Sequence, residues 1–237
     1  MIGRRLIGHR LIGHSLIGHH LIGRRTLLAT LGATALGPRP AHAALPVPEG
    51  NRLSFRVLRG DSAIGTHVLY FDPHDDILDV RSEVDLRVGF GPFTLFRYTL
   101  RSTERWTAGA FETLDATTND NGTQDFARIK RVADGLWVEG SQAPRYLAPP
   151  NALPSSHWNK AELDGPWINP QDGKLLHPVV AQLGVGDVPA ANGPPIAATQ
   201  YALSGDVQMH LWYDSTPSWV ALHFTAHDGS LIRYERM

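Results

Sequence analysis

Hydrophobic and charged residues alternate strictly between residues 78 and 88. Leu, Val or Ser stands at each even position of this run, and Asp, Arg or Glu stands at each odd position. A strand places successive side chains on opposite faces, so a period of two predicts a strand with one face buried and the other in water. One-sided burial of this kind is typical of an antiparallel sheet.

Many other short segments show the same period and are separated by Gly, Pro, Asn or Asp. Residues 53–58 and 64–71 form a predicted hairpin with its turn at Arg59-Gly60-Asp61-Ser62. Asn121-Gly122 is a typical tight-turn pair between two more strands. The remaining strands are predicted at 93–106, 111–118, 126–132, 136–140, 144–148, 175–183, 196–203, 207–213, 219–226 and 231–234.

Two segments interrupt this pattern. Pro149-Pro150 and Pro154 exclude a central strand, and Ser156 is placed to cap a short helix that runs through Trp158 and Leu163. Residues 184–195 are rich in Gly and Pro and are predicted to form a flexible loop. About ten to twelve strands with one helical insertion therefore predict a single mainly β domain, built as a strongly curved antiparallel sheet or an open β-barrel.

The N-terminal 43 residues have the features of an export signal. Arg24-Arg25 precede a twelve-residue uncharged run, which is followed by prolines and the small-residue site Ala41-His42-Ala43. The run is too short for a membrane span, which needs about 20 residues, so no stable membrane anchor is predicted. The paired arginines resemble a twin-arginine signal, behind a pentapeptide repeat that predicts no fold. We expect the twin-arginine translocation machinery to export the chain, with the general secretory route as the alternative. We also expect cleavage after Ala43 and a folded domain at 44–237 that is periplasmic or secreted.

Composition excludes several classes of function for this domain. Beyond the signal, 13 Arg and 3 Lys face 23 acidic residues, a net charge of −7 that disfavours nucleic acids and anionic lipid surfaces. The absence of Cys excludes disulfides, a thiol nucleophile and a lipid-modified cysteine anchor. Metal-binding, serine-hydrolase, phosphate-binding and dinucleotide-binding motifs are also missing from the sequence, so no cofactor is predicted.

One polar and aromatic cluster could form a ligand site at the mouth of the curved sheet. Its members are His157, Trp158, Asn159, Trp167, Asn169, Gln171 and Asp172. In that role an indole would supply a stacking wall, amides would orient the ligand and the histidine would carry a proton. The alternative is a plug that covers the open end of the sheet and uses these side chains to satisfy its own backbone.

Glu104 is predicted to point into the apolar interior, because it shares even positions with Tyr98, Leu100 and Trp106. An unpaired buried charge costs several kcal/mol. We expect Arg97, His157 or the polar plug to provide its partner. The alternative is a general acid or base with a raised pKa.

Seven short motifs stand out along the chain: LSFRVLRG (53–60), IGTH (64–67), RSTERW (101–106), HWN (157–159), NPQDGKL (169–175), LSGD (203–206) and LWYD (211–214). Together they resemble the motifs of an exported bacterial family known as domain of unknown function 6134. The resemblance covers residues 53–234 and implies no activity and no catalytic residues.

The sequence thus favours a non-catalytic exported protein. It would bind an apolar or amphipathic molecule on its concave face or serve as a scaffold for an envelope partner. One alternative is a hydrolase that uses His157 with Asp172 or Glu104. The other is a purely structural interaction module, which would have an exposed edge or apolar patch and no cavity.

Overall fold

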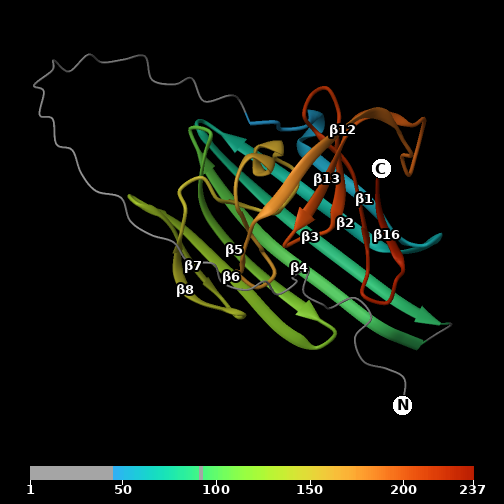
Figure 1. The fold of residues 1–237 in the computed structure, drawn as a ribbon, viewed down its shortest axis with the longest axis horizontal. Coiled ribbons are helices and arrows are strands. Elements are labelled where there is room, and N and C mark those ends of the chain that lie inside the picture. The colour runs from blue at the N-terminus through green and yellow to red at the C-terminus, as the bar shows by residue number, and fades with distance from the viewer. Residues whose placement is uncertain (1–44, 91–92) are drawn as a thin grey trace, which may run out of the picture.

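A computed structural model describes residues 45–90 and 93–237, most of which belong to one large antiparallel sheet. Its 13 strands follow the order β12-β13-β14-β15-β16-β1-β2-β3-β4-β5-β6-β7-β8, and the sheet is not closed because β12 and β8 form its two edges. Figure 1 shows the long central strands β2 to β5 crossing the molecule diagonally. The strands are β1 (Arg52–Arg59), β2 (Ser62–His74), β3 (Ile77–Phe90), β4 (Phe93–Thr107), β5 (Ala110–Asp120), β6 (Thr123–Val132), β7 (Gly135–Gly140), β8 (Ala143–Ala148), β12 (Pro178–Val188), β13 (Ile196–Gly205), β14 (Met209–Tyr213), β15 (Trp219–Thr225) and β16 (Leu231–Arg236).

The predicted mainly β, single-domain fold is confirmed. The alternating run at 78–88 lies inside β3, and β1 and β2 form the predicted hairpin, preceded by one short 3-10 turn at Glu49–Asn51. The predicted export signal, including Arg24, Arg25 and the cleavage site after Ala43, lies outside the described residues. Within those residues, no helix is long and apolar enough to cross a membrane.

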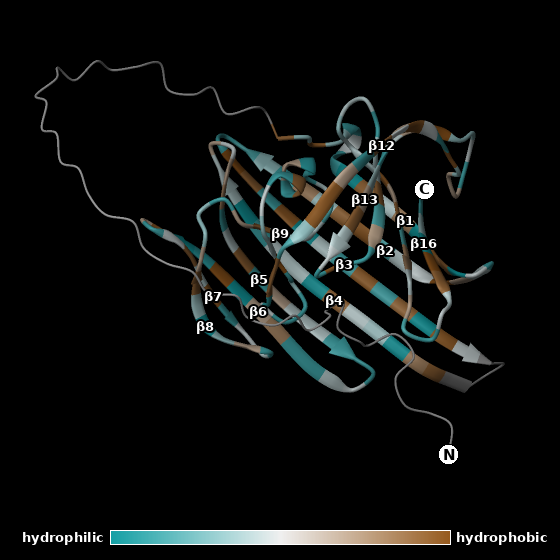
Figure 2. Cartoon of the chain, viewed as in Figure 1, coloured by the Kyte–Doolittle hydropathy of each residue, from teal (hydrophilic) through white to brown (hydrophobic). Residues whose placement is uncertain are grey.

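The sheet curls so that its two halves share one core. In Figure 1, β12 and β13 pass in front of the long strands β2 to β4. Leu53 and Phe71 from one half belong to the same buried cluster as Tyr201 and Leu203 from the other. Figure 2 shows hydrophobic and hydrophilic bands alternating along the long strands, as expected when only the concave face is buried.

An insertion at residues 149–177 connects the two edge strands, β8 and β12. It contains a 3-10 helix, η2 (Lys160–Asp164), and a small sheet of β9 (Leu153–Pro154), β10 (Trp167–Ile168) and β11 (Leu175–Leu176). Trp158, Trp167 and Ile168 are fully buried in the main core. The insertion therefore packs against the concave face and fills part of it.

The predicted cap of this helix is wrong. Asn159, and not Ser156, precedes η2, and its side chain accepts a hydrogen bond from the backbone N–H of Ala161 at 3.1 Å. Asn and Ser are equally suitable caps, so the sequence alone could not decide between them. Ser156 instead lies three residues earlier and contacts Glu104.

The predicted flexible loop at 184–195 is also partly wrong, because β12 continues to Val188. β13 pairs with it along its full length, with an irregularity between Gln182 and Gly184, and these cross-strand bonds outweigh the low strand preference of glycine. β12 is an edge strand with exposed Val179, Leu183 and Val185.

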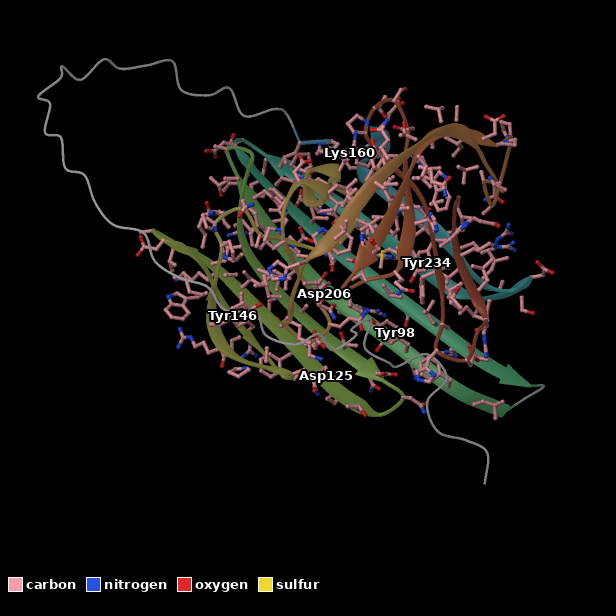
Figure 3. The ribbon with its side chains drawn as sticks, in the orientation of Figure 1. Tyr98, Asp125, Tyr146, Lys160, Asp206 and Tyr234 are labelled. Carbon is pink, nitrogen blue, oxygen red and sulfur yellow. The ribbon has the colours of Figure 1, made fainter. Side chains whose placement is uncertain are left out.

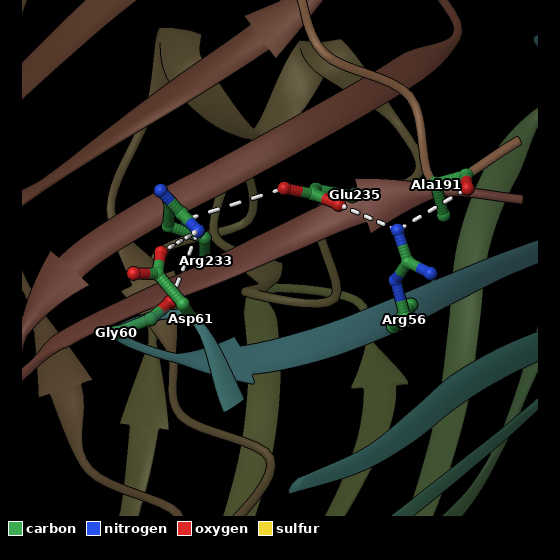
Figure 4. Close-up of polar contacts among 6 residues, drawn as sticks. All are labelled: Arg56, Gly60, Asp61, Ala191, Arg233 and Glu235. Atoms are coloured by element: carbon green, nitrogen blue, oxygen red, sulfur yellow. Dashed lines mark hydrogen bonds and ion pairs between the residues drawn. The ribbon is translucent and has the colours of Figure 1, made fainter. Parts of the chain in front are cut away.

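The first and last strands of the domain, β1 and β16, are neighbours in the middle of the sheet. Figure 4 shows ion pairs on their outer surface: Arg56 contacts Glu235 at 3.1 Å, and Arg233 contacts Asp61 at 3.2 Å. Arg56 also donates to the carbonyl of Ala191 at 3.2 Å. This hydrogen bond connects the loop after β12 to the β1–β16 pair, which we call the seam. Partly exposed ion pairs contribute little energy, so the seam is stabilised mainly by its backbone ladder and buried side chains.

Candidate functional site

A cavity of about 160 Å³ lies between the insertion and the concave face of the sheet. Its walls come from β2 to β4 on one side and β14 to β16 on the other. Figure 3 labels two of the lining side chains, Tyr98 on β4 and Tyr234 on β16. The apolar wall includes Val84, Leu86, Leu100, Met209, Leu222 and Phe224. Polar side chains of the lining include His67, Ser82, Ser102, Ser155, Ser156, His157, Asn169, Gln171, Thr225 and His227.

Small polar residues on the sheet form part of the cavity wall. Ser82 on β3 and Ser102 on β4 face each other across the ladder, and both are buried. His67 on β2 lies with Nε2 2.7 Å from the Ser82 hydroxyl oxygen. Burial, with a smaller effect of His157, lowers the pKa of His67 to about 3, so its ring is neutral at ordinary pH. The short serine side chains leave space where large apolar residues would fill the sheet.

His157 lies opposite, in the insertion, and is held by Glu162. Its Nδ1 is 2.7 Å from one carboxylate oxygen of Glu162, and its backbone N–H donates to the other at 2.9 Å. The Tyr213 hydroxyl lies 3.4 Å from the same carboxylate. The backbone of His157 has a φ of 67°, a left-handed conformation that is uncommon for residues other than glycine. This conformation and the two bonds fix the ring at the cavity wall.

Glu104 lies behind this wall and is almost completely buried. Trp106 and Trp158 donate their indole N–H groups to its carboxylate at 3.0 and 3.2 Å, and Ser156 provides a third hydrogen bond. Burial raises the pKa of Glu104 to about 7 and nearby Glu162 adds to the rise, whereas the three hydrogen bonds oppose it.

The expected partners of Glu104 are therefore wrong in part. Arg97 is exposed, since odd positions of β4 face outward, and His157 pairs with Glu162 instead. The polar insertion supplies two of the three donors, which is the third alternative that the sequence left open.

The other predicted site residues fall into two groups. His157, Trp167, Asn169 and Gln171 line the cavity. Trp158, Asn159 and Asp172 lie outside its lining and hold the insertion in place. Trp158 packs edge-on against Phe71 and Trp106, with ring centroids 5.3 Å apart in both pairs. The Asp172 side chain accepts from the Lys174 backbone at 3.2 Å. The predicted ligand-binding role of the whole set stays a prediction.

Sequence reasoning missed His67, Ser82, Ser102 and Ser156 as cavity residues. A usable signal existed for two of them, since Ser82 and Ser102 occupy inward positions within runs of large apolar residues. His67 carried no such signal, because an irregularity in the pairing of β1 with β2 shifts the alternation between Ile64 and His67. Among the described residues, no group of three or more His, Asp or Glu could hold a metal ion.

Residues 55–237 match the family model described as domain of unknown function DUF6134. The chain belongs to this family. The fold of this DUF6134 domain is similar to the crystal structure of a beta-barrel-like protein of domain of unknown function DUF1849 from Brucella abortus. The TM-score is 0.55 at 12% sequence identity, over 78% of this chain and 94% of that one, so the likeness shows the fold alone. No curated protein matches the DUF6134 chain.

Proposed function

We propose that this protein is a non-catalytic binding protein for a small amphipathic molecule, which it holds between the insertion and the concave face of its sheet. The observation that supports this is the cavity of about 160 Å³ with apolar side chains on one part of its wall and histidines and serines on another. Ligand sites in proteins combine apolar walls with a few placed polar groups in the same way. Exposed Thr225 and His227 belong to the lining and give the cavity a solvent-facing rim.

We place this activity in the periplasm or outside the cell. Support comes from Arg24-Arg25, the uncharged run after them and the small-residue site that ends at Ala43. The twin-arginine translocation machinery, which would be the partner in transit, carries proteins that have already folded. The finished cavity would therefore arrive intact at the site of its ligand.

Filling the cavity tests the proposal. Ser102→Ile adds a β-branched side chain to the cavity wall, whereas Thr103→Ile makes nearly the same change on the exposed face of β4. We expect a panel of small amphiphiles, followed by native mass spectrometry and tryptophan fluorescence, to show binding that Ser102→Ile weakens at least tenfold. Thr103→Ile should bind as the wild type does. Equal binding by the two variants, or no bound molecule at all, would contradict the proposal.

A hydrolase is the second candidate, favoured by the 2.7 Å contact between His157 Nδ1 and Glu162, which resembles a general base with its orienting carboxylate. Asp172 does not line the cavity, and Glu104 reaches it only through Ser156. Turnover of p-nitrophenyl butyrate that is lost in His157→Asn would support this candidate.

A scaffold for an envelope partner would instead use the exposed edge strand β12. Its binding to that partner would not change in Ser102→Ile.

A further inference from the structure

The side chains around the cavity carry no fixed positive charge. Among the described residues that line it, none is Lys, Arg, Asp or Glu. Burial raises the pKa of Tyr98 and of Tyr234, and lowers that of His67 to about 3, so these three groups are uncharged at ordinary pH. A ligand carboxylate placed here would lose its water without meeting a cation, which is costly.

Two buried carboxyl groups stand directly behind the polar wall. Ser156 lines the cavity and hydrogen-bonds Glu104, and His157 lines it and binds Glu162. Charges interact strongly across a low-dielectric interior, so Glu104, which is ionised above its pKa of about 7, adds repulsion against an anionic ligand head at pH 8. The surroundings of the polar wall are thus neutral or negative.

The hydrogen bonds of the wall indicate which uncharged head it accepts. Nδ1 of His157 contacts the Glu162 carboxylate, and a neutral imidazole that carries its proton on Nδ1 has Nε2 as an acceptor. Within the described residues, Nε2 makes no hydrogen bond. Ser102 provides a hydroxyl group from the sheet, and Ser82, whose hydroxyl oxygen lies 2.7 Å from His67 Nε2, faces it across the ladder. A ligand hydroxyl group can donate to the ring nitrogen and accept from a serine.

We propose that the cavity selects a small uncharged amphiphile with a hydroxyl head, an alcohol or a phenol, and discriminates against the carboxylate of equal length. Its apolar body packs on Val84, Leu86 and Leu100. The volume of about 160 Å³ is close to that of a cavity of about 150 Å³ that accepts benzene, which corresponds to a body of about six carbons. This inference rests on the proposed binding function and names its ligand class.

Three probes of equal chain length test the selection: hexan-1-ol, hexanoate and hexylammonium, titrated into the full chain at pH 8. Calorimetry and the fluorescence of the tryptophans, one of which, Trp167, lines the cavity, report binding. We expect hexan-1-ol to bind at least tenfold more tightly than hexanoate. Equal or tighter binding of hexanoate, or tightest binding of hexylammonium, would overturn the hydroxyl assignment alone. No binding of any probe would contradict the binding function together with its ligand class.

Replacing the acceptor tests its role. His157→Asn keeps a side chain that tolerates the left-handed backbone and can still donate to Glu162, but it removes Nε2. We expect the preference for hexan-1-ol over hexanoate to fall at least fivefold, while the exposed His74→Asn leaves it unchanged. Ser82→Ala serves as a second variant, checked by its melting temperature. An unchanged preference in folded forms of both variants would overturn the assignment.

Discussion

The buried carboxyl group of Glu104 is contacted by hydrogen-bond donors and not by a cation. Two indole N–H groups and one hydroxyl surround it, and two of these three donors come from the insertion. Glu104 therefore links β4 to the insertion, and the free energy of that link depends on whether its carboxyl group carries a proton. The residue's ordinary pKa is 4.5, and burial raises it to about 7.

Glu104→Gln should change how stability depends on pH. Between pH 4.5 and 7 the folded protein keeps the Glu104 proton while the unfolded chain has lost it, so stability from this group falls as pH rises and is level above 7. The full effect is about 3 kcal/mol, from a shift of about 2.5 units. Urea unfolding at pH 4.5, 6 and 8 measures this effect. From pH 4.5 to pH 8, the free energy of unfolding of the variant should rise by this amount relative to that of the wild type.

The comparison uses the difference between the two proteins, because His67 titrates in the opposite sense. Its folded pKa is lowered from 6.5 to about 3, so its contribution is lost as pH falls through this range. Glu139 is exposed, and Glu139→Gln is the matched control. Its difference in unfolding free energy from the wild type should not change with pH. A difference between wild type and Glu104→Gln that stays constant with pH would show that the pKa of Glu104 is not raised in the folded state.

At the scale of elements, the insertion meets the sheet through a close backbone contact. A Cβ atom added at Gly140, at the end of β7, would lie 2.1 Å from the carbonyl oxygen of Asp172 and 2.7 Å from the Cα of Gly173. The Tyr146 hydroxyl donates to the Gly173 carbonyl at 2.8 Å beside it. Glycine is needed here because two backbones touch, and no side chain can be accommodated.

Gly140→Ala should therefore destabilise the protein by about 2 kcal/mol, the range typical of overpacking against backbone that cannot move away. Gly186→Ala is the control, since its added Cβ meets nothing within 4 Å and its φ is not left-handed. We expect the control to stay within about 0.5 kcal/mol of the wild type in urea unfolding. Equal stability of the two variants would mean that the insertion is not fixed at this contact.

The strands and the cavity differ in how much of them the sequence could predict. Strands such as β3 were predictable because burial on one side of a sheet repeats every second residue. The extent of β12 was not, because its pairing with β13 is a long-range effect that local composition does not record. The cavity was predictable only in part, as His157, Asn169 and Gln171 are close in sequence, whereas Ser82 and His67 meet them only through the curvature of the sheet.

At the scale of the whole molecule, the sequence predicted a curved open sheet but not the order in which its strands pair. The pairing of β1 with β16 joins residues 55 and 236 and cannot be read from any local signal. The insertion connects the two edges of the sheet, so the concave face is covered without a closed barrel.

Export of the whole chain is testable directly. Replacing both Arg24 and Arg25 with Lys should retain full-length protein in the cytoplasm, because the twin-arginine route depends on the arginine pair. Cell fractionation should find the wild type outside the inner membrane, and N-terminal sequencing should begin at Ala44. Replacing Arg4 and Arg5 with Lys is the control and should leave export unchanged. Equal export of both double variants would contradict the twin-arginine assignment.

The seam between β1 and β16 has a consequence for synthesis. A ribosome produces β1 early, yet the strand that pairs with one of its sides is the last of the sheet to emerge. Loop closure over such a separation is slow, and an unpaired strand side is open to wrong partners until it occurs. Completion of the sheet must therefore wait until translation has passed β16, which favours a delivery route that accepts the chain only afterwards.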